Sequence, residues 1–453
     1  MLCCGIGCMV SFTNVHFTKC TLLVLDGAEA NLQSCEFAHD LDSSHGLSVL
    51  AYGDQSSVQM HGGLITGGAV GAAAYSGATL TMSDVAVSKL SVTGVESQGD
   101  TSSVSISNSS FEEFSGCCRH ATHTHAIHAH ACSTMELKNV SISGQFVDYG
   151  VLVHSLATVS MLDCCVSGTK KCAVEIGPGS TGNLQGCKLS RCKESGIHVS
   201  GRESSCDAVS CSLEENGSSG ACASRHSRLQ LQSCTSKHNK GKGGYVVKSG
   251  ASLKLIECSS FADAVGCHAV GAFAALTAHL CHVARSEKAL VEVAAGARAE
   301  LDSCQLEKAV DEGVLVESAG SWVSLEGCAV AETRGSCVLV RKGAKAALKW
   351  CKLERSKDWN GLDSHDVGTE VHLEQCTVRH NKQNGVSAVH GSVGKAIACR
   401  SVGNEGYGYS ACSQGHITAI DCSSDGNGAG ASGSAGDGVV VKERLWVGGA
   451  LEA

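Results

Sequence analysis

Short alternations of apolar and polar residues, each followed by a cysteine, recur along most of the chain. Stretches such as LQLQSC, LKLIEC, AELDSC and VHLEQC have a period of two, which is typical of a short strand with one buried face. A second alternating piece, such as YGVLVHS or EGVLVES, precedes each cysteine, and an apolar residue follows it by two positions, as in CQL and CTV. Each repeat therefore predicts about three short strands separated by turns.

The cysteines keep a nearly constant spacing. They stand at Cys164, Cys187, Cys211, Cys234, Cys258, Cys281, Cys304, Cys328, Cys351, Cys376, Cys399 and Cys422. This period is too short for a βαβ unit, and the repeat lacks the asparagine and leucine framework of leucine-rich repeats. The sequence therefore predicts an all-β fold, a single-stranded parallel β-helix (solenoid) of about 18 coils of roughly 23 residues.

Cysteine at this position suits an inward-pointing corner of the coil, where a small apolar side chain fits. Equivalent Cβ atoms in stacked coils lie about 4.8 Å apart, which is too far for a disulfide bond. We therefore expect reduced thiols and a cytoplasmic protein, with secretion as the alternative.

Two further residue types recur at fixed distances from the cysteine. Asparagine follows it by five positions and predicts a ladder of stacked amides: Asn216, Asn239, Asn381, Asn404 and Asn427. Glycine follows it by nine positions, where we expect a tight turn with positive φ: Gly196, Gly220, Gly243, Gly313, Gly385 and Gly408.

The β-helix is expected over residues 1–425. The segment 426–453 is predicted to be a flexible Gly/Ser-rich tail, because it contains most of the run SSDGNGAGASGSAGDG at residues 423–438. It ends with VVVKERLWVGGALEA, which could add a terminal strand. The formal charge is −9 without a basic run, which argues against a nucleic-acid partner. No apolar run approaches 18 residues, so a membrane-spanning helix is not expected.

The repeat resembles the right-handed β-helix superfamily, the pectate-lyase-like group. The resemblance rests on N-x-x-x-G-v-x-v followed by L-x-L-x-x-C-x-v, as in NKQNGVSAV and IACRSV, and covers roughly residues 10–425. It implies right-handed coils, and a scaffold used by lyases, hydrolases, epimerases, binding proteins and some F-box proteins. The hydrolase motifs of the group are not intact here. Their nearest fragments are VRK at Val340–Lys342 and NGLDSHD at Asn360–Asp366.

Enzymes of this superfamily bind sugar chains along one outer face, so outward residues were aligned at one position per coil. They are His128, Leu152, Glu175, His198, Cys222, Val246, His268, Glu292, Leu315, Leu339, Asp363, Ser387 and Ser410. Two polar clusters emerge on this face. The first holds His128, His154, Glu175 and His198, and the second holds Asp363, His365 and Asp366. A carboxylate beside a histidine can act as acid and base, although both clusters could also be solvated faces of the stack. The apolar middle of the row suggests that a partner or a loop covers it.

The segment CCRHATHTHAIHAHAC is rich in histidine. Its candidate metal ligands are His123, His125, His128 and His130, which could hold Zn²⁺ or Cu²⁺; the alternative is a protein without a cofactor. Ile127, Ala129 and Ala131 fit inward positions, which would turn His128 and His130 outward and leave His120, His123 and His125 in the preceding loop.

The preferred function is a non-catalytic scaffold that binds a protein or a polysaccharide along its strand face. It rests on the incomplete catalytic motifs, the thiol-rich core and even coils without a loop-walled cleft. The alternatives are a carbohydrate-active enzyme (a lyase, hydrolase or epimerase) that uses the outward Asp, Glu and His residues, and a fragment of a larger F-box-type adaptor.

Overall fold

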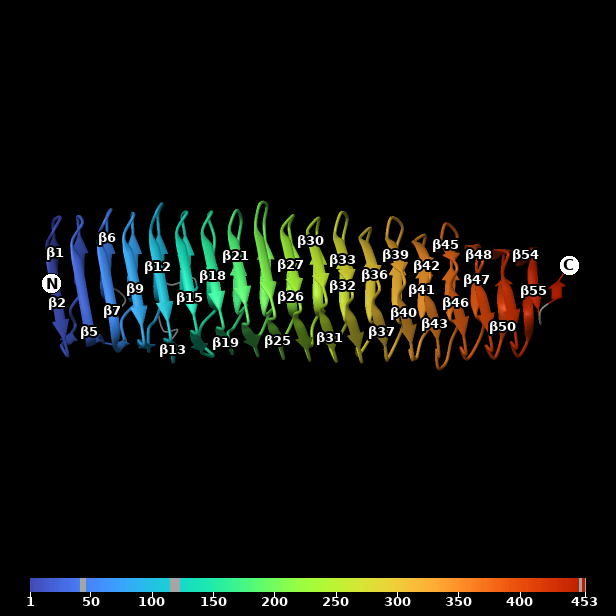
Figure 1. The fold of residues 1–453 in the computed structure, drawn as a ribbon, viewed down its shortest axis with the longest axis horizontal. Coiled ribbons are helices and arrows are strands. Elements are labelled where there is room, and N and C mark those ends of the chain that lie inside the picture. The colour runs from blue at the N-terminus through green and yellow to red at the C-terminus, as the bar shows by residue number, and fades with distance from the viewer. Residues whose placement is uncertain (41–45, 115–122, 448–449, 453) are drawn as a thin grey trace. The chain divides into compact units, whose positions relative to one another are not determined.

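The computed structural model describes residues 1–40, 46–114, 123–447 and 450–452, and every regular element in these ranges is a β-strand (Figure 1). The chain is a parallel β-solenoid of about 19 coils with about 23 residues each, which confirms the predicted fold class. It divides into two compact units. The first comprises Met1–Cys222 and His226–Gln230, and the second comprises Ala223–Arg225 and Leu231–Ala453.

One coil of the second unit shows how the sequence forms the repeat. Its strands are β29 (Gly243–Lys248), β30 (Ser252–Ile256) and β31 (Ser259–Phe261). In β30 the side chains of Leu253 and Leu255 are buried, while Ser252 and Lys254 between them are exposed. The period-two pattern therefore places one face of the strand in the core and the other in solvent.

The first strand of each coil joins one parallel sheet, here called sheet A, and the other two join a second sheet, sheet B. In the first unit, sheet A consists of β1 (Leu2–Cys4), β4 (Leu22–Leu25), β6 (Leu47–Tyr52), β8 (Val70–Tyr75), β11 (Thr93–Gln98), β14 (His125–His130), β17 (Tyr149–Val153), β20 (Val174–Ile176) and β23 (Ile197–Ser200). In the second unit it consists of β29, β32 (Cys267–Val270), β35 (Val291–Ala294), β38 (Val314–Glu317), β41 (Val338–Arg341), β44 (Leu362–His365), β47 (Val386–Val389), β50 (Tyr407–Cys412) and β53 (Gly430–Ala435). The residues of β26 (Ser219–Ser224) are divided between the two units.

The predicted cysteine ladder is confirmed. All twelve cysteines of the register are at most 3% exposed, and no disulfide bond joins the cysteines of the described residues. The residue before each of them has a φ of 50° to 64°, which turns the chain sharply between the two sheet B strands of a coil. The thiol of Cys351, for example, donates to the carbonyl of Lys349 and to that of Leu325 in the preceding coil, each at 3.3 Å.

The prediction of positive φ at the recurring glycines is wrong for all but one of them. Among the six, only Gly243 has a positive φ. At four of the others, Gly196, Gly313, Gly385 and Gly408, glycine is needed because the backbone of the next coil passes too close for a side chain. A Cβ atom on Gly385 would lie 2.6 Å from the carbonyl oxygen of Gly408 and 3.0 Å from Nδ2 of Asn404.

The asparagine ladder is confirmed in the last coils. Nδ2 of Asn381 donates to Oδ1 of Asn404, and Nδ2 of Asn404 donates to Oδ1 of Asn427, both at 2.9 Å. Each oxygen also accepts the backbone N–H of the preceding ladder residue at 3.0 Å. Asp263 takes the same place beyond Asn239, whose backbone N–H and Nδ2 donate to Oδ1 of Asp263 at 2.8 Å and 2.9 Å.

We expect the substitution Asp263→Asn to stabilise the protein at neutral pH by on the order of 1 kcal/mol. Burial raises the pKa of Asp263, and this effect exceeds that of the hydrogen bonds it accepts, which lower the pKa. The folded state therefore keeps this proton at pH values where the unfolded chain has lost it, so wild-type stability falls as pH rises through the folded pKa. An asparagine would carry no charge and could donate to Ser260 Oγ, as Asn404 donates to Ser401 Oγ at 3.0 Å.

Urea unfolding between pH 4 and pH 8 tests this expectation. The difference between D263N and wild type should grow with pH, whereas Asp207→Asn, which changes an exposed carboxylate on β24 (Ser205–Val209), should leave the pH profile unchanged. The expectation would be contradicted if the stability of D263N relative to wild type were lower at pH 8 than at pH 4.

The segment after residue 425 contains further strands. β53, β54 (Val439–Glu443) and β55 (Leu445–Val447) pair in parallel with β50, β51 (His416–Ile420) and β52 (Ser423–Asp425), and β56 (Ala450–Glu452) pairs antiparallel with β55. A further coil thus stands where the sequence suggested a tail with a possible strand, while the predicted flexibility stays a prediction. Among the described residues, no helix has the length and apolar character that a membrane crossing requires.

Candidate functional site

The outward row of sheet A follows the predicted register within each unit. His128 pairs with Leu152, Leu152 with Glu175, and Glu175 with His198 in the first unit. In the second unit the pairing runs without a slip through Val246, His268, Glu292, Leu315, Leu339, Asp363, Ser387 and Ser410. The side chains chosen from the sequence therefore lie one above another.

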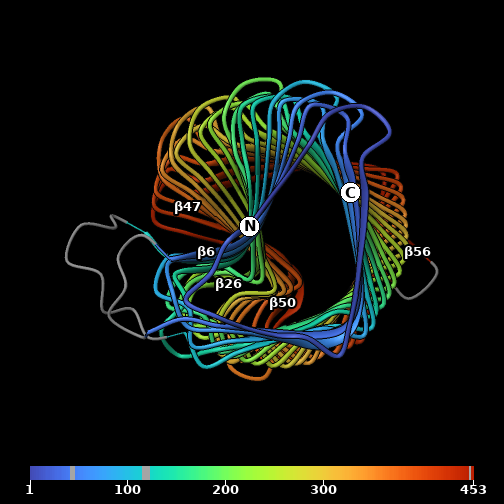
Figure 2. The ribbon, with the colours of Figure 1, turned by 90° about the vertical axis from the view of Figure 1, so that its left-hand side faces the viewer.

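This row is recessed, in contrast to the outer face of sheet B. Leu315 in β38 is only partly exposed, whereas the outward residues of β36 (Arg298–Asp302), which are Arg298, Glu300 and Asp302, are exposed. An end-on view shows the backbone bending inward at the sheet A strand β50 (Figure 2). Val246, in the apolar middle of the row, is already fully buried by its own chain, so no partner is needed to cover it.

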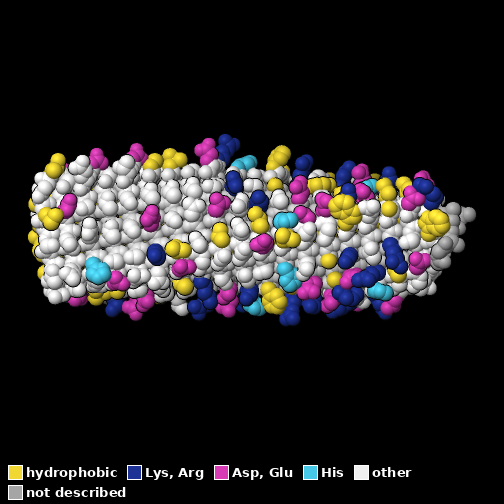
Figure 3. Space-filling view, in the orientation of Figure 1, with side chains coloured by type: hydrophobic (Ala, Val, Ile, Leu, Met, Phe, Trp, Pro, Cys, Tyr) yellow, Lys and Arg dark blue, Asp and Glu magenta, His cyan; other side chains and the backbone are white. Residues whose placement is uncertain are grey.

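The outer face of sheet B carries ladders of opposite charges. Lys345 and Lys349 on β42 (Lys345–Lys349) face Glu370 and Glu374 on β45 (Glu370–Glu374), with Nζ to carboxylate distances of 2.7 Å and 3.4 Å. Basic and acidic side chains are correspondingly interleaved over these strands (Figure 3). Such exposed pairs support the stacking of coils rather than form a pocket.

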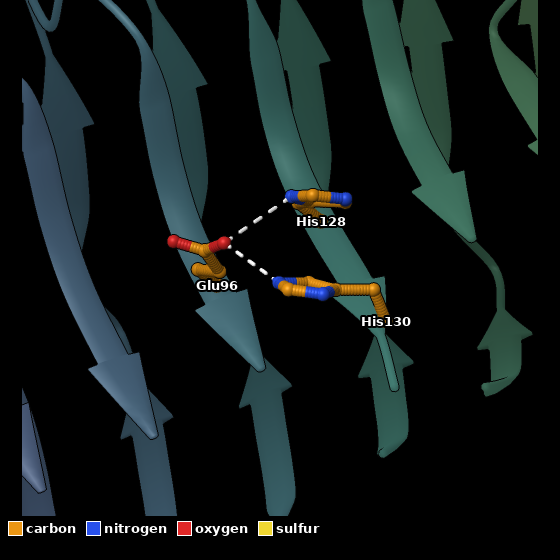
Figure 4. Close-up of side chains that lie close together, drawn as sticks. All are labelled: Glu96, His128 and His130. Carbon is orange, nitrogen blue, oxygen red and sulfur yellow. Dashed lines mark hydrogen bonds and ion pairs between the residues drawn. The ribbon is translucent and has the colours of Figure 1, made fainter. Parts of the chain in front are cut away.

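The first polar cluster lies in the first unit and centres on Glu96. Its Oε1 lies 2.8 Å from Nε2 of His130 and 3.4 Å from Nδ1 of His128, and its Oε2 accepts the hydroxyl of Tyr75 at 2.7 Å (Figure 4). Nε2 of His154 lies 2.9 Å from Nε2 of His128. Burial opposes ionisation of Glu96, but hydrogen bonds from His128, His130 and Tyr75 lower its pKa below the usual range. Burial and the neighbouring histidines lower the pKa of His154 to about 4.

The four predicted metal ligands do not form one group. His128 and His130 lie together, but His123 lies apart, with its Nδ1 3.6 Å from Asp148 Oδ2. His125 was expected in a loop; it begins β14 instead and is only 8% exposed. Its Nδ1 has no hydrogen-bond partner, and burial lowers its pKa to about 3. His120 lies outside the described residues.

Glu175 and His198 belong to a second cluster in the same unit, so the predicted group of four divides into two pairs. Nδ1 of His198 lies 2.8 Å from Oε2 of Glu175, and the buried thiol of Cys172 is within 4.8 Å of both ligand atoms. Burial raises the pKa of Cys172 to about 12, against a hydrogen bond with His198 that lowers it. Burial opposes the charged form of His198, but hydrogen bonds with Cys172, Cys222 and Glu175 raise its pKa.

The cluster in the second unit lines a pocket of about 430 Å³. Its walls are formed by Glu312, Ser336, Leu339, Arg341, Lys342, Trp359, Asp363, His365 and Asp366. The pocket contradicts the expectation of coils without a loop-walled cleft, because the turn before β44 carries Trp359 to the rim, where the ring is 50% exposed. The two sequence fragments VRK and NGLDSHD meet here, since Val340 of the first pairs with Ser364 of the second across β41 and β44.

The pocket contains an acid–base arrangement. Oδ2 of Asp363 lies 3.1 Å from Nε2 of His365, and this hydrogen bond raises the pKa of His365. Oδ1 of Asp363 is buried and has no hydrogen-bond partner among the residues that the structure describes, so it can accept a hydrogen bond from a ligand. Burial raises the pKa of Glu312. Asp366 accepts a hydrogen bond from the backbone N–H of Lys342 at 3.0 Å. Its carboxylate therefore stabilises the turn at Lys342.

A larger hollow of about 850 Å³ lies in the first unit. It is lined by turn residues that include Glu113, Lys170, Arg191 and Lys193. Among the described residues of this hollow, no carboxylate meets a histidine or a cysteine. It therefore offers less chemistry than the sheet A clusters.

Three functional residues escaped the sequence analysis. Glu96 pairs with His128 across β11 and β14, but 32 positions separate the two because the histidine-rich insertion interrupts the register. Glu312 and Trp359 lie in turns rather than on strands, where the alternating pattern gives no signal.

The family of the chain follows from its sequence as well as from its coils. The family model described as right handed beta helix region matches residues 113–260 and 312–444. These ranges are more than half of the 453 residues, and the chain belongs to this family. The right-handed coils implied by the resemblance are thereby confirmed.

Solved structures with similar folds are distant in sequence. The periplasmic alginate epimerase AlgG is 10% identical, with 82% of this chain and 77% of that chain covered and a TM-score of 0.34. Pectate lyase Pel9A is 11% identical, with 60% and 70% covered and a TM-score of 0.35. The Vag8–C1 inhibitor complex gives 10% identity, 99% and 98% coverage and a TM-score of 0.41. No curated protein matches the chain in sequence.

Proposed function

We propose that this protein is a β-helix scaffold that binds a polysaccharide along the recessed face of sheet A, with the Trp359 pocket as its principal subsite. The observation that carries the proposal is the composition of that pocket. An exposed indole ring stands at the rim, and charged hydrogen-bonding groups line the floor. Sugar rings have apolar faces that stack on aromatic rings and hydroxyl edges that need donors and acceptors.

The floor of the pocket supplies both kinds of hydrogen-bonding group. Arg341 and Lys342 donate, although each already contacts Glu317 Oε2 at 2.9 Å, which fixes their positions. Asp363 accepts through its free Oδ1. The volume of about 430 Å³ lies within the range of ligand sites and suits one or two sugar residues.

The test is electrophoresis of the native protein through gels cast with acidic and neutral polysaccharides. We expect one polysaccharide to retard the wild-type protein, and Trp359→Ala to weaken that binding about tenfold, or ~1.4 kcal/mol. Trp350→Ala is a matched control, because Trp350 is also 50% exposed but lies outside the pocket. Unchanged mobility in every gel, or equal losses in the two variants, would refute the proposal.

A carbohydrate-active enzyme is the second candidate, favoured by the proximity of Asp363 to His365 and by the raised pKa of Glu312. A carboxyl group with a raised pKa is better suited to donate a proton as general acid, and a nearby carboxylate or imidazole can accept one as base. If the pocket is catalytic, wild-type protein should release reducing ends from the bound polysaccharide. Asp363→Asn and Glu312→Gln should then lose product formation while they still bind. If the wild-type protein binds the polysaccharide but forms no product, the enzyme candidate is rejected and the scaffold function is retained.

A further inference from the structure

Two histidines and one carboxylate converge on the recessed face in the first unit, away from the pocket proposed above (Figure 4). The ligand atoms of Glu96, His128 and His130 all lie within 4.8 Å of one another. Glu96 Oε1 is 2.8 Å from His130 Nε2 and 3.4 Å from His128 Nδ1. The three side chains are only 13% to 17% exposed.

The strand geometry produces this convergence. Glu96 and His128 are register partners on adjacent parallel strands, and such strands lie about 4.8 Å apart. His130 follows His128 by two positions and therefore points from the same face. The two imidazole rings stack at a centroid distance of 4.4 Å with an interplanar angle of 17°.

The remaining polar atoms of two of these residues are already held by neighbours. The Tyr75 hydroxyl donates to Glu96 Oε2 at 2.7 Å, which leaves Oε1 to face the histidines. Nε2 of His128 lies 2.9 Å from Nε2 of His154, whose Nδ1 lies 2.7 Å from Ser155 Oγ. Partners on the far atoms of ligand side chains fix the tautomer and orientation of metal ligands in proteins.

We propose that Glu96, His128 and His130 form a binding site for a divalent transition-metal ion such as Zn²⁺. The ion would be bound by Glu96 Oε1, His128 Nδ1 and His130 Nε2, with a water molecule in the fourth position. Tetrahedral Zn²⁺ with bonds of about 2.0–2.1 Å places its ligands about 3.3–3.4 Å apart, which matches the 3.4 Å between Glu96 Oε1 and His128 Nδ1. The 2.8 Å between Glu96 Oε1 and His130 Nε2 is a hydrogen-bond distance that would lengthen when the ion replaces the proton. Tyr75 and His154 are positioning residues that hold Glu96 and His128.

The donor set selects the class of metal. Imidazole nitrogen suits Zn²⁺, Cu²⁺ and Ni²⁺, whereas Ca²⁺ and Mg²⁺ prefer oxygen ligands throughout. Binding requires each imidazole to carry its proton on the nitrogen away from the ion. For His128 that nitrogen is Nε2, which would then donate to His154 Nε2.

The first experiment measures Zn²⁺ binding to the chelator-treated full chain by equilibrium dialysis and isothermal titration. We expect Glu96→Gln and His130→Gln each to lose one equivalent of bound Zn²⁺. His279→Gln is the matched control, because its Nδ1 also pairs with a carboxylate, Asp302, at 2.8 Å, but no third ligand joins that pair among the described residues. It should retain the full stoichiometry, and circular dichroism should show the same fold in all variants.

Tyr75→Phe tests the positioning role separately. It should weaken Zn²⁺ binding by about 10- to 100-fold without a change in stoichiometry or in the midpoint of thermal unfolding. A variant that shifts only the unfolding midpoint would show that Tyr75 is structural and would count against the site.

Co²⁺ substitution identifies the donor atoms. We expect visible ligand-field absorption without a thiolate charge-transfer band, because the proposed site contains no sulfur. A thiolate band that persists in E96Q would place the metal on the cysteines, including the Cys172, Glu175 and His198 cluster, and would overturn the proposal. Equal Zn²⁺ stoichiometry in wild type, E96Q and H130Q would do the same.

Discussion

Replacing Asn404 by alanine is expected to lower the free energy of unfolding of its coil by about 3–5 kcal/mol. Oδ1 of Asn404 accepts both the backbone N–H and Nδ2 of Asn381, and Nδ2 of Asn404 donates to Asn427. Alanine would leave two buried donors of Asn381 without an acceptor, and each such donor costs about 1–3 kcal/mol. Asn381 and Asn404 are each 1% exposed, so water cannot replace the lost partners without opening the coil.

Native-state hydrogen exchange is the appropriate measurement, because a repeat array can open locally. Amides of β46 (Thr377–Arg379) and β49 (Arg400–Val402) should exchange much faster in the variant. Asn183→Ala on β21 (Thr181–Gln185) is the control, since Asn183 is exposed. A loss below 1 kcal/mol at β46 and β49 would mean that the ladder is not a main source of stability.

Gly408→Ala is expected to destabilise the second unit by about 2–3 kcal/mol although it adds a single methyl group. A Cβ atom at this position would overlap Ser424 Oγ and lie 2.6 Å from the carbonyl oxygen of Ala431. The carbonyl of Ala431 belongs to the next coil, so the methyl group would push two coils apart. The Ser424 hydroxyl cannot easily move away, because it donates to the Ala431 carbonyl at 3.1 Å and accepts from Asn427 Nδ2 at 2.9 Å.

Gly394→Ala provides the matched comparison in the same unit. Its Cβ would meet Ile417 Cγ1 at 3.4 Å and nothing closer, and its φ is not positive. We expect it to be neutral or stabilising by about 0.4–1 kcal/mol, because alanine reduces the entropy of the unfolded chain. The urea midpoint should therefore fall for Gly408→Ala and stay unchanged or rise for Gly394→Ala. Equal shifts in the two variants would disprove the explanation that the next coil leaves no space for a Cβ atom at Gly408.

The architecture could be predicted from the sequence because each coil repeats the same constraints. The cysteine at a corner and the alternation before it correctly predicted the register of the outward row from His128 to His198 and from Val246 to Ser410. The prediction of positive φ at the recurring glycines failed because two different requirements both select glycine. One is a backbone with positive φ, and the other is a lack of space for a Cβ atom; the sequence does not distinguish them. In Gly313, for example, the neighbouring backbone of Cys337 and the side chain of Val330 exclude a Cβ atom.

The candidate sites were predicted only in part. Glu175, His198, Asp363 and His365 lie on strands, so their pairing followed from the register. Glu96 is separated from His128 by a histidine-rich insertion that interrupts the repeat period, and the spacing alone does not reveal that partner. Trp359 and Glu312 come from turns, whose conformations depend on contacts between coils rather than on a local pattern.

The ladder of buried cysteines has an experimental consequence. Each regular coil carries one thiol that is at most 3% exposed, so an alkylating reagent reaches it only when that coil opens. Pulsed alkylation followed by peptide mass spectrometry would therefore give a separate opening rate for each coil. The protein thus contains its own series of reporters, with which the unravelling of a solenoid can be followed residue by residue without any added label.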